Sequence, residues 1–317
     1  MADVHSVIFD VLIIGSGPAG LSAGIYSGRG RLSTLIIERL KPGGQAAITN
    51  EMENYPGTEE GETGPGLIAK MVKQAERFGV QRETDDVTGI DLSGSVKTVT
   101  GKKGVYKAKS VIIASGAFPK VIGCKGELEF TGKGVSYCAT CDAAFFEGME
   151  VFVVGAGDSA IQEALYLTRF ARKVTVFYRK SQAEMRAAKS LLEKAFAEPK
   201  LNFVYHTVVE ELQGETGILD TIITKNTQTN ELTTYTADPD DGTFGLFVFI
   251  GFVPNTDVFK GAITMEDGYI LADEDMRTNI DGVFVAGDCR KKNLRQVVTA
   301  VADGAIAAVY AEKYLTH

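Results

Sequence analysis

Cysteine and histidine are scarce in this sequence. Four cysteines occur among 317 residues, far below the density found in the disulfide-built scaffolds of small secreted proteins. They are Cys124, Cys138, Cys141 and Cys289. The three histidines, His5, His206 and His317, lie far apart and lack the spacing of metal ligands. We therefore expect neither a disulfide-rich extracellular fold nor a structural zinc site.

Long apolar runs and basic blocks are also missing. No stretch reaches the roughly 18 uninterrupted apolar residues that a membrane span requires. Asp10 interrupts the opening apolar run and no basic segment precedes it, so a buried strand is predicted there and not a signal peptide. The net charge of −8 is spread along the chain, which disfavours nucleic acid and anionic membranes as partners. A cytoplasmic protein that acts on a small molecule or a protein partner is expected.

A glycine-rich loop occurs twice, each time between a predicted strand and a predicted helix. The aliphatic segments 7–14 and 151–154 precede the two loops. The first glycine of such a loop permits a tight turn, the second lets backbone N–H groups approach a pyrophosphate, and a small third residue lets the helix pack on the strand. The predicted binding residues are Gly15, Gly17, Pro18, Ala19 and Gly20 in the first loop and Gly155, Gly157, Asp158, Ser159 and Ala160 in the second.

Two such loops in one chain predict an α/β protein with two Rossmann-like, three-layer nucleotide-binding domains. The length of 317 residues and the 44% of hydrophobic residues can fill two cores. We expect the second domain to be inserted in the first, with a first FAD-binding part at 1–116, the inserted domain at 117–243 and a second FAD-binding part at 244–317. Glycines near 114–118 and 240–245 are candidate hinges.

The residue that ends the second strand of each unit distinguishes the two ligands. Glu38 ends the first of these strands, roughly twenty residues after Gly15. A carboxylate there accepts hydrogen bonds from both ribose hydroxyls and repels a 2′-phosphate, so FAD or NAD is predicted.

The corresponding position of the second unit carries cations. Tyr178 is followed there by Arg179 and Lys180, and Arg186 comes shortly afterwards. Charge-assisted contacts from these side chains suit the 2′-phosphate of NADPH. The alternative is that the three cations are ordinary solvated charges.

The last third of the sequence is expected to return to the first nucleotide site. Segment 246–256 is predicted to be a buried strand and a turn of that domain, and 283–289 a second strand that ends at Asp288. This aspartate is placed either to bind a ribityl hydroxyl of a flavin or to cap the next helix. That helix, 295–315, points its N-terminal dipole toward the same site and could stabilise negative charge on a reduced flavin.

Cys138 and Cys141 are separated by two residues and followed directly by Asp142. The pattern fits a metal site, a static disulfide or a redox-active pair. Structural zinc takes four Cys or His ligands, and no second CxxC is present. A static disulfide is unusual in the cytoplasm, and closing so short a loop gives little entropic stabilisation. A reversible disulfide is favoured, with Asp142 either a proton donor and acceptor for the leaving thiolate or an ordinary acid near a helix N-terminus.

Taken together, these motifs resemble those of the low-molecular-weight thioredoxin reductases over nearly the whole chain. The matching stretches are 15-GSGPAG-20, 43-GGQ-45, 53-ENYPG-57, 137-YCATCD-142, 155-GAGDSA-160, 287-GD-288 and 295-RQVVTAVADGAIAA-308. The resemblance implies a homodimeric flavoprotein that passes electrons from NADPH to FAD, from FAD to the CxxC disulfide and from the dithiol to thioredoxin. It also implies that the inserted domain rotates, so that nicotinamide and cysteines alternate beside the flavin.

The family pattern assigns roles to individual residues. Cys141 is expected to face the flavin, Cys138 to attack the thioredoxin disulfide, and Asp142 to act as the acid and base. The further residues expected to bind FAD are Gly44, Gln45, Asn54, Val87, Gly116, Gly287, Asp288, Arg295, Gln296 and Val297.

The chain departs from the family pattern after the second strand. The common stretch His-Arg-Arg-Asp is replaced by 178-YRKS-181, and 185-MRA-187 arrives two residues late. The usual glycine after CxxCD is Ala143. Two alternatives follow: a disulfide reductase fed by ferredoxin, whose known relatives tend to have lost the second glycine loop that this chain keeps, and a redox sensor.

Overall fold

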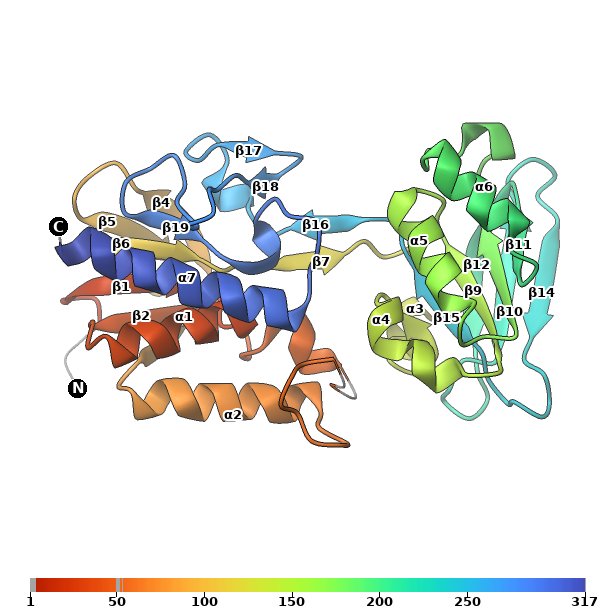
Figure 1. Cartoon of the computed structure of the whole chain (residues 1–317), viewed down its shortest axis with the longest axis horizontal. Helices are drawn as coiled ribbons and strands as arrows, with labels where there is room; N and C mark the ends of the chain where they lie inside the picture. The colour runs from red at the N-terminus through yellow and green to blue at the C-terminus, as the bar shows by residue number, and fades with distance from the viewer. Residues whose placement is uncertain (1–3, 50–51, 53, 317) are drawn as a thin grey trace. The chain divides into compact units, whose positions relative to one another are not determined.

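The structure, a computed structural model, describes residues 4–49, 52 and 54–316. The chain forms two compact units, Met1–Phe118 with Val253–His317 and Pro119–Phe252 (Figure 1). It passes between them twice, in β7 (Ala117–Pro119) and β16 (Phe252–Pro254), which pair as a two-stranded sheet. The second unit is thus inserted in the sequence of the first.

A seven-stranded sheet in the order β3-β2-β1-β6-β5-β4 forms the first unit, with β19 paired to β6. Strands β3, β2, β1, β6 and β19 are parallel, whereas β4 and β5 are antiparallel additions. The strand bounds are β1 Ile8–Ile14, β2 Thr34–Glu38, β3 Gln81–Thr84, β4 Val87–Asp91, β5 Lys97–Gly101, β6 Val105–Ile113 and β19 Val283–Val285, with a small hairpin of β17 Met265–Glu266 and β18 Tyr269–Ile270. The helices are α1 Pro18–Arg29, α2 Gly64–Arg77, α7 Val297–Thr316 and the 3₁₀ turns η1 Gly44–Ile48, η4 Asp257–Phe259 and η5 Gly287–Cys289.

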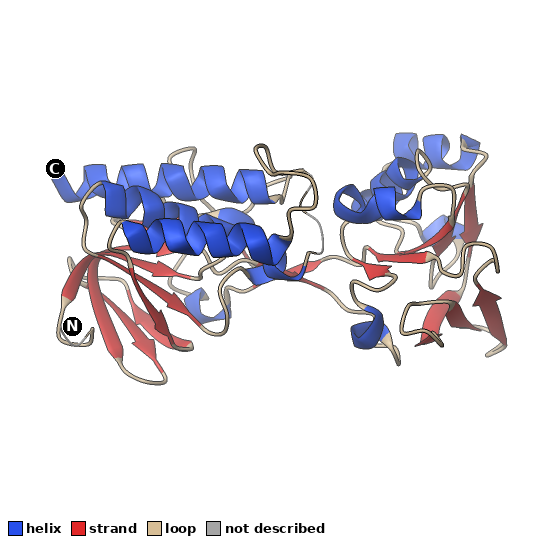
Figure 2. Cartoon of the chain, turned by 90° about the horizontal axis from the view of Figure 1, so that it is seen from below, coloured by secondary structure: helices blue, strands red, loops and turns tan. Residues whose placement is uncertain are grey.

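The central strand β1 feeds two cores because successive side chains of a strand point to opposite faces. Val11 and Ile13 pack toward the long helices, and Leu12 and Ile14 pack toward the other face. Figure 2 shows the long helices of this unit gathered on one side of its strands. A strand buried on both faces must be apolar throughout its centre, which explains the aliphatic run.

Helix α2 forms where a capping residue precedes an apolar stripe at helical spacing. The Thr63 side chain accepts a hydrogen bond from the Gly66 N–H at 3.0 Å and so satisfies one of the free donors of the first turn. Leu67, Ile68 and Met71 are buried in the core, as helical spacing of an amphipathic stripe requires.

The second unit is built on a five-stranded, fully parallel sheet in the order β11-β10-β9-β15-β8. An antiparallel sheet of three strands, β12-β13-β14, completes the unit. The strand bounds are β8 Val135–Ser136, β9 Glu150–Val154, β10 Lys173–Phe177, β11 Leu201–Val204, β12 Thr207–Gln213, β13 Thr221–Asn226, β14 Leu232–Thr236 and β15 Gly245–Val248. The helices are α3 Glu127–Phe130, α4 Ala139–Asp142, α5 Asp158–Leu167 and α6 Lys189–Ala197, with the 3₁₀ turns η2 Ala143–Phe146 and η3 Gln182–Glu184.

One predicted assignment is wrong, namely the return of segment 246–256 to the first unit. Strand β15 pairs with β9 at the centre of the second sheet, so the second crossing falls at Phe252–Pro254 and not near residue 243. The predicted hinge 240–245 is a turn inside the second unit, where Asp241 accepts a hydrogen bond from Arg172 at 2.5 Å. An apolar run predicts a strand that is buried on both faces of a sheet, but nothing in the run indicates which parallel strand it will pair with.

Candidate cofactor sites and redox centre

The first glycine loop joins β1 to α1 and leaves space beside its second glycine. Gly15 has a φ of 105°, and a Cβ atom there would overlap the Ala114 carbonyl oxygen. A Cβ on Gly20 would overlap the Gly15 carbonyl, so the helix start packs directly on the loop. Around Gly17, in contrast, the nearest atom to an added Cβ lies 3.9 Å away. This is the local geometry by which a loop offers its N–H groups to a pyrophosphate.

Glu38 is held against this loop by Ser16. The Ser16 N–H and hydroxyl donate to Glu38 Oε2 at 2.8 and 2.9 Å. The Leu40 N–H donates to the other carboxylate oxygen at 3.3 Å. The carboxylate predicted to recognise the ribose is therefore fixed beside the predicted pyrophosphate loop. The sequence motif gave Ser16 no role of its own.

Asp288 and Arg295 supply buried polar atoms that no described residue satisfies. Asp288 Oδ1 and Arg295 Nε are buried and have no hydrogen-bond partner among the residues that the structure describes. Burial raises the pKa of the Asp288 carboxyl. Buried polar groups in native proteins are normally paired, so these atoms fit a polar ligand that completes them. The ribityl and isoalloxazine polar groups of a flavin are such a ligand.

Gly287 is placed by Asp303, which the sequence analysis missed. The Gly287 N–H donates to Asp303 Oδ2 at 3.0 Å, and Lys292 Nζ and Arg290 Nη2 donate to the same carboxylate at 2.8 and 3.2 Å. A Cβ on Gly287 would lie 2.8 Å from Ala19 Cβ, so the Gly287 turn sits on the start of α1. The structure therefore brings the predicted 287–288 turn and the first glycine loop together.

The other residues predicted to bind FAD lie in the first unit. Asn54 Nδ2 donates to Gln296 Oε1 at 3.3 Å, which brings two of them together from distant parts of the sequence. Among the described residues, and apart from its chain neighbours, no atom lies within 4 Å of a Cβ added to Gly116, and the nearest to one on Gly44 is 3.9 Å away. Gln45 lies in η1, Val87 begins β4 and Val297 begins α7. Binding by each of them remains a prediction.

The second glycine loop repeats the first in the other unit. Gly155 has a φ of 125° and leaves no room for a side chain beside the Phe249 carbonyl oxygen. Beyond its own chain neighbours, no atom of the part of the chain that the structure describes lies within 4 Å of a Cβ added to Gly157. Asp158, the first residue of α5, accepts the Ala188 N–H at 2.8 Å. The predicted residues Ser159 and Ala160 follow in the first turn of the same helix, and Ala160 is buried.

The predicted cationic segment lies between β10 and α6. Lys180 forms an ion pair with Glu184 at 3.1 Å. Arg179 and Arg186 are exposed and form no ion pair within the described part of the chain. Two of the three predicted cations are thus available to an anionic ligand.

Cys138 and Cys141 form a disulfide whose Cα atoms are 5.3 Å apart. Cys138 is the N-cap of α4, which is followed directly by η2 up to Phe146. Half-buried Asp142 follows, and burial raises the pKa of its carboxyl, while a hydrogen bond from Ser136 opposes the rise. Ser136 Oγ donates to Asp142 Oδ2 at 2.6 Å and accepts the Cys138 N–H at 3.1 Å. Ser136 therefore links the acid to the cysteine backbone, a contact that the motif did not reveal.

Nucleotide-linked disulfide oxidoreductases combine glycine loops of the dinucleotide type with a redox-active disulfide, and this chain has two such loops and a disulfide beside a half-buried acid. Comparison with known proteins points the same way. The family model described as pyridine nucleotide-disulphide oxidoreductase matches residues 9–304.

Relatives match over nearly their full lengths. A thioredoxin reductase of Peptoclostridium acidaminophilum is 57% identical, with 97% of each chain covered. A thioredoxin reductase of Bacillus subtilis is 45% identical over 97% of this chain and 95% of its own. The crystal structure of thioredoxin reductase from Streptococcus pyogenes superposes with a TM-score of 0.91 at 44% identity, covering 98% of both chains.

The chain therefore belongs to the pyridine nucleotide-disulphide oxidoreductase family, within its thioredoxin reductases. The predicted resemblance and the predicted α/β fold with parallel sheets are confirmed. No helix in the part of the chain that the structure describes is long and apolar enough to cross a membrane.

Proposed function

We propose that the protein is a cytoplasmic, NADPH-dependent thioredoxin reductase that holds FAD in the first unit and NADPH in the second. The observation that carries the proposal is the Cys138–Cys141 disulfide beside a half-buried acid, in the same unit as a second dinucleotide-type loop. When bound, FAD supplies the two-electron chemistry that links a nicotinamide hydride donor to a disulfide.

The first unit holds the cofactor by complementary polar groups. Glu38, oriented by Ser16, would accept hydrogen bonds from the ribose hydroxyls, and the space beside Gly17 would admit the pyrophosphate. Asp288 and Arg295 would bind polar groups of the flavin through their buried atoms that lack a partner among the described residues. Binding thus removes the cost of leaving buried polar atoms unpaired.

The second unit carries the thiol chemistry. Reduction of the disulfide adds two electrons and two protons and gives two thiols. The Cys138 thiolate then attacks the disulfide of thioredoxin and forms a mixed disulfide with it. Cys141 attacks the sulfur of Cys138, which restores the Cys138–Cys141 disulfide and releases thioredoxin as a dithiol. Burial raises the pKa of the Asp142 carboxyl and so favours its protonated form, which suits a group that exchanges a proton with the departing thiolate.

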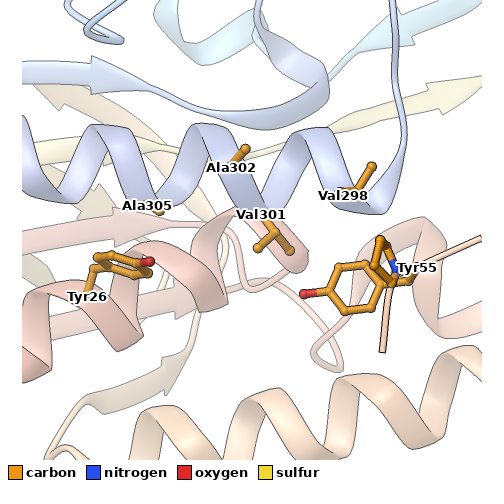
Figure 3. A pocket seen from close by; sticks show the side chains of 7 residues that line it. Tyr26, Tyr55, Val298, Val301, Ala302 and Ala305 are labelled. Atoms are coloured by element: carbon orange, nitrogen blue, oxygen red, sulfur yellow. The ribbon is translucent and has the colours of Figure 1, made fainter. Parts of the chain in front are cut away.

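The protein acts as a homodimer in this proposal. An apolar groove of about 260 Å³ lies between α1, α7 and the segment around Tyr55 (Figure 3). Its lining is Tyr26, Tyr55, Pro56, Val298, Val301, Ala302 and Ala305. Tyr26 and Val298 are 49% and 39% exposed, and apolar side chains grouped in this way fit a second copy of the chain.

Anaerobic titration tests the electron donor. NADPH is expected to bleach the flavin absorption, whereas bleaching by reduced ferredoxin alone would favour the ferredoxin-fed alternative. If neither these donors nor NADH bleach it, the enzyme proposal is wrong and the redox-sensor alternative gains support.

Cys138→Ser tests the thiol pathway. The variant should lose thioredoxin turnover and keep flavin reduction by NADPH, because the serine hydroxyl cannot attack a disulfide. Cys124→Ser is the matched control, since Cys124 is a half-buried free cysteine and its pKa is raised to about 11, chiefly by burial. Undiminished turnover in the Cys138 variant would remove the pair from the mechanism.

A further inference from the structure

The segment that differs from the family pattern contains a short helical turn. Residues 182–184 make η3, and Ser181 and Glu184 close it as a capping box. The Ser181 N–H and hydroxyl donate to Glu184 Oε2 at 3.2 and 2.9 Å. Both contacts satisfy groups at the start of the turn, so this carboxylate is held in one place.

Glu184 also forms an ion pair with Lys180, one of the residues predicted to bind the nucleotide. Lys180 Nζ donates to Glu184 Oε1 at 3.1 Å. This contact, with those from Ser181, lowers the pKa of the Glu184 carboxyl to about 2. The carboxylate is therefore ionised throughout the working pH range and neutralises one of three predicted cations.

The turn lies at the predicted ribose end of the second site. Tyr178 directly follows β10, and its N–H donates to the carbonyl of Val204, the last residue of β11. The Tyr178 hydroxyl donates to the Glu184 carbonyl at 2.8 Å. On the other side, the Ala188 N–H bonds Asp158 of the glycine loop. The adenosine ribose of a dinucleotide lies between a glycine loop and the end of the following strand. Glu184 thus places a fixed negative charge close to where a 2′-phosphate would bind.

We propose that Glu184 is a specificity-determining residue that weakens the preference of the second site for the 2′-phosphate of NADPH over the free 2′-hydroxyl of NADH. The inference rests on the proposed nucleotide site of the second unit. Arg179 and Arg186 still attract the phosphate, but the carboxylate cancels Lys180 and repels the same phosphate. A ribose with a free 2′-hydroxyl meets no such repulsion.

Glu184→Gln isolates the charge, because glutamine keeps an oxygen that can accept the Ser181 N–H. The binding of NADP⁺ and NAD⁺ to the FAD-loaded protein is measured by calorimetry, with kcat/KM for NADPH and NADH alongside. We expect the ratio of NADP⁺ to NAD⁺ affinity to rise about fivefold, the size expected when one exposed charge is removed.

Glu215→Gln is the control for net charge. Glu215 follows β12, at the opposite end of that strand from Thr207, whose N–H bonds the Tyr178 carbonyl. It should leave the nucleotide ratio unchanged. A ratio that does not move in the Glu184 variant, or that moves equally in both variants, would overturn the inference. Failure of both nucleotides to bind the wild-type protein would instead overturn the proposed function.

Discussion

Asp303→Asn is expected to destabilise the first unit strongly, because it breaks a buried ion cluster. The Asp303 carboxylate accepts hydrogen bonds from Lys292, Arg290 and the Gly287 N–H. The side chains of Asp303 and Lys292 are each only 8% exposed. Neither charge can regain full hydration when the other is lost.

The magnitude follows from what the variant leaves behind. Removing one partner of a buried pair costs about 3–5 kcal/mol, since the other charge stays buried and uncompensated. Asparagine still offers an oxygen to the Gly287 N–H, and Arg290 is 18% exposed and can reach water, so we expect about 3 kcal/mol. For a domain of this size that corresponds to a fall of roughly 6–12 °C in Tm.

The assay is thermal unfolding of the FAD-loaded protein, with flavin fluorescence recorded in the same scan. Because Asp303 fixes the turn that presents Asp288, the variant should also release FAD at a lower temperature and bind it more weakly at 25 °C. Lys291→Met is the matched control, since Lys291 pairs only with exposed carboxylates of Glu266 and Asp267 and its loss should cost under about 1 kcal/mol.

The double variant Asp303→Asn with Lys292→Met separates the cause. It removes both ends of the buried pair, so it should recover part of the stability lost in the single variant. If Asp303→Asn costs no more than Lys291→Met, or if the double variant is less stable than the single one, the account of the cluster is wrong.

Three further outcomes are expected at the two loops and the redox centre. Gly157→Ala should melt like the wild type, because its Cβ meets nothing, yet bind nucleotide about tenfold more weakly by calorimetry; unchanged affinity would contradict the pyrophosphate role. Ser136→Ala removes a hydrogen bond that favours the ionised form of Asp142, so it should raise the pKa of Asp142 further and move the alkaline limb of the pH profile of turnover to higher pH. An alkaline limb that stays at the wild-type pH would show that Asp142 does not titrate in the reaction. Because a raised carboxyl pKa costs stability only once the group ionises, that variant should lose more stability at neutral pH than in acid. Ser16→Ala frees Glu38 and should weaken FAD binding about five- to tenfold by fluorescence titration, whereas equal binding would show that Ser16 does not orient the carboxylate.

Much of the fold could be predicted from the sequence, because its signals are local. The β1–loop–α1 unit needs glycine at positions set by neighbours within a few residues, and Glu38 ends the next strand along the chain. The membership of β15 in the second sheet could not be predicted. It depends on pairing with β9, nearly a hundred residues earlier, and several apolar strands would satisfy the same burial.

The site shows the same division. Cys138, Cys141 and Asp142 are adjacent in sequence, so their chemistry can be inferred from the motif. Asp303 lies within an apolar helix, and its contacts with Gly287 and Lys292 arise only when α7 folds back beside the 287–289 turn. A charged residue on the buried face of an otherwise apolar helix was the available signal, since such a residue is rarely buried without a partner.

The turn at Glu184 is only partly predictable from the sequence. The stretch Ser181-Gln182-Ala183-Glu184 carries the S-x-x-E signature of a capping box, so its local structure can be predicted from sequence alone. Its consequence for the nucleotide cannot, because this depends on Ala188 reaching Asp158 and thereby holding the turn beside the glycine loop. The two residues by which this segment exceeds the family pattern are thus accommodated by a short helix, and the acid of the segment is Glu184, whereas the family pattern has an aspartate at the position of Ser181. A difference in loop length here changes the electrostatics of the site, and the ratio of the two nucleotide affinities measures that change directly.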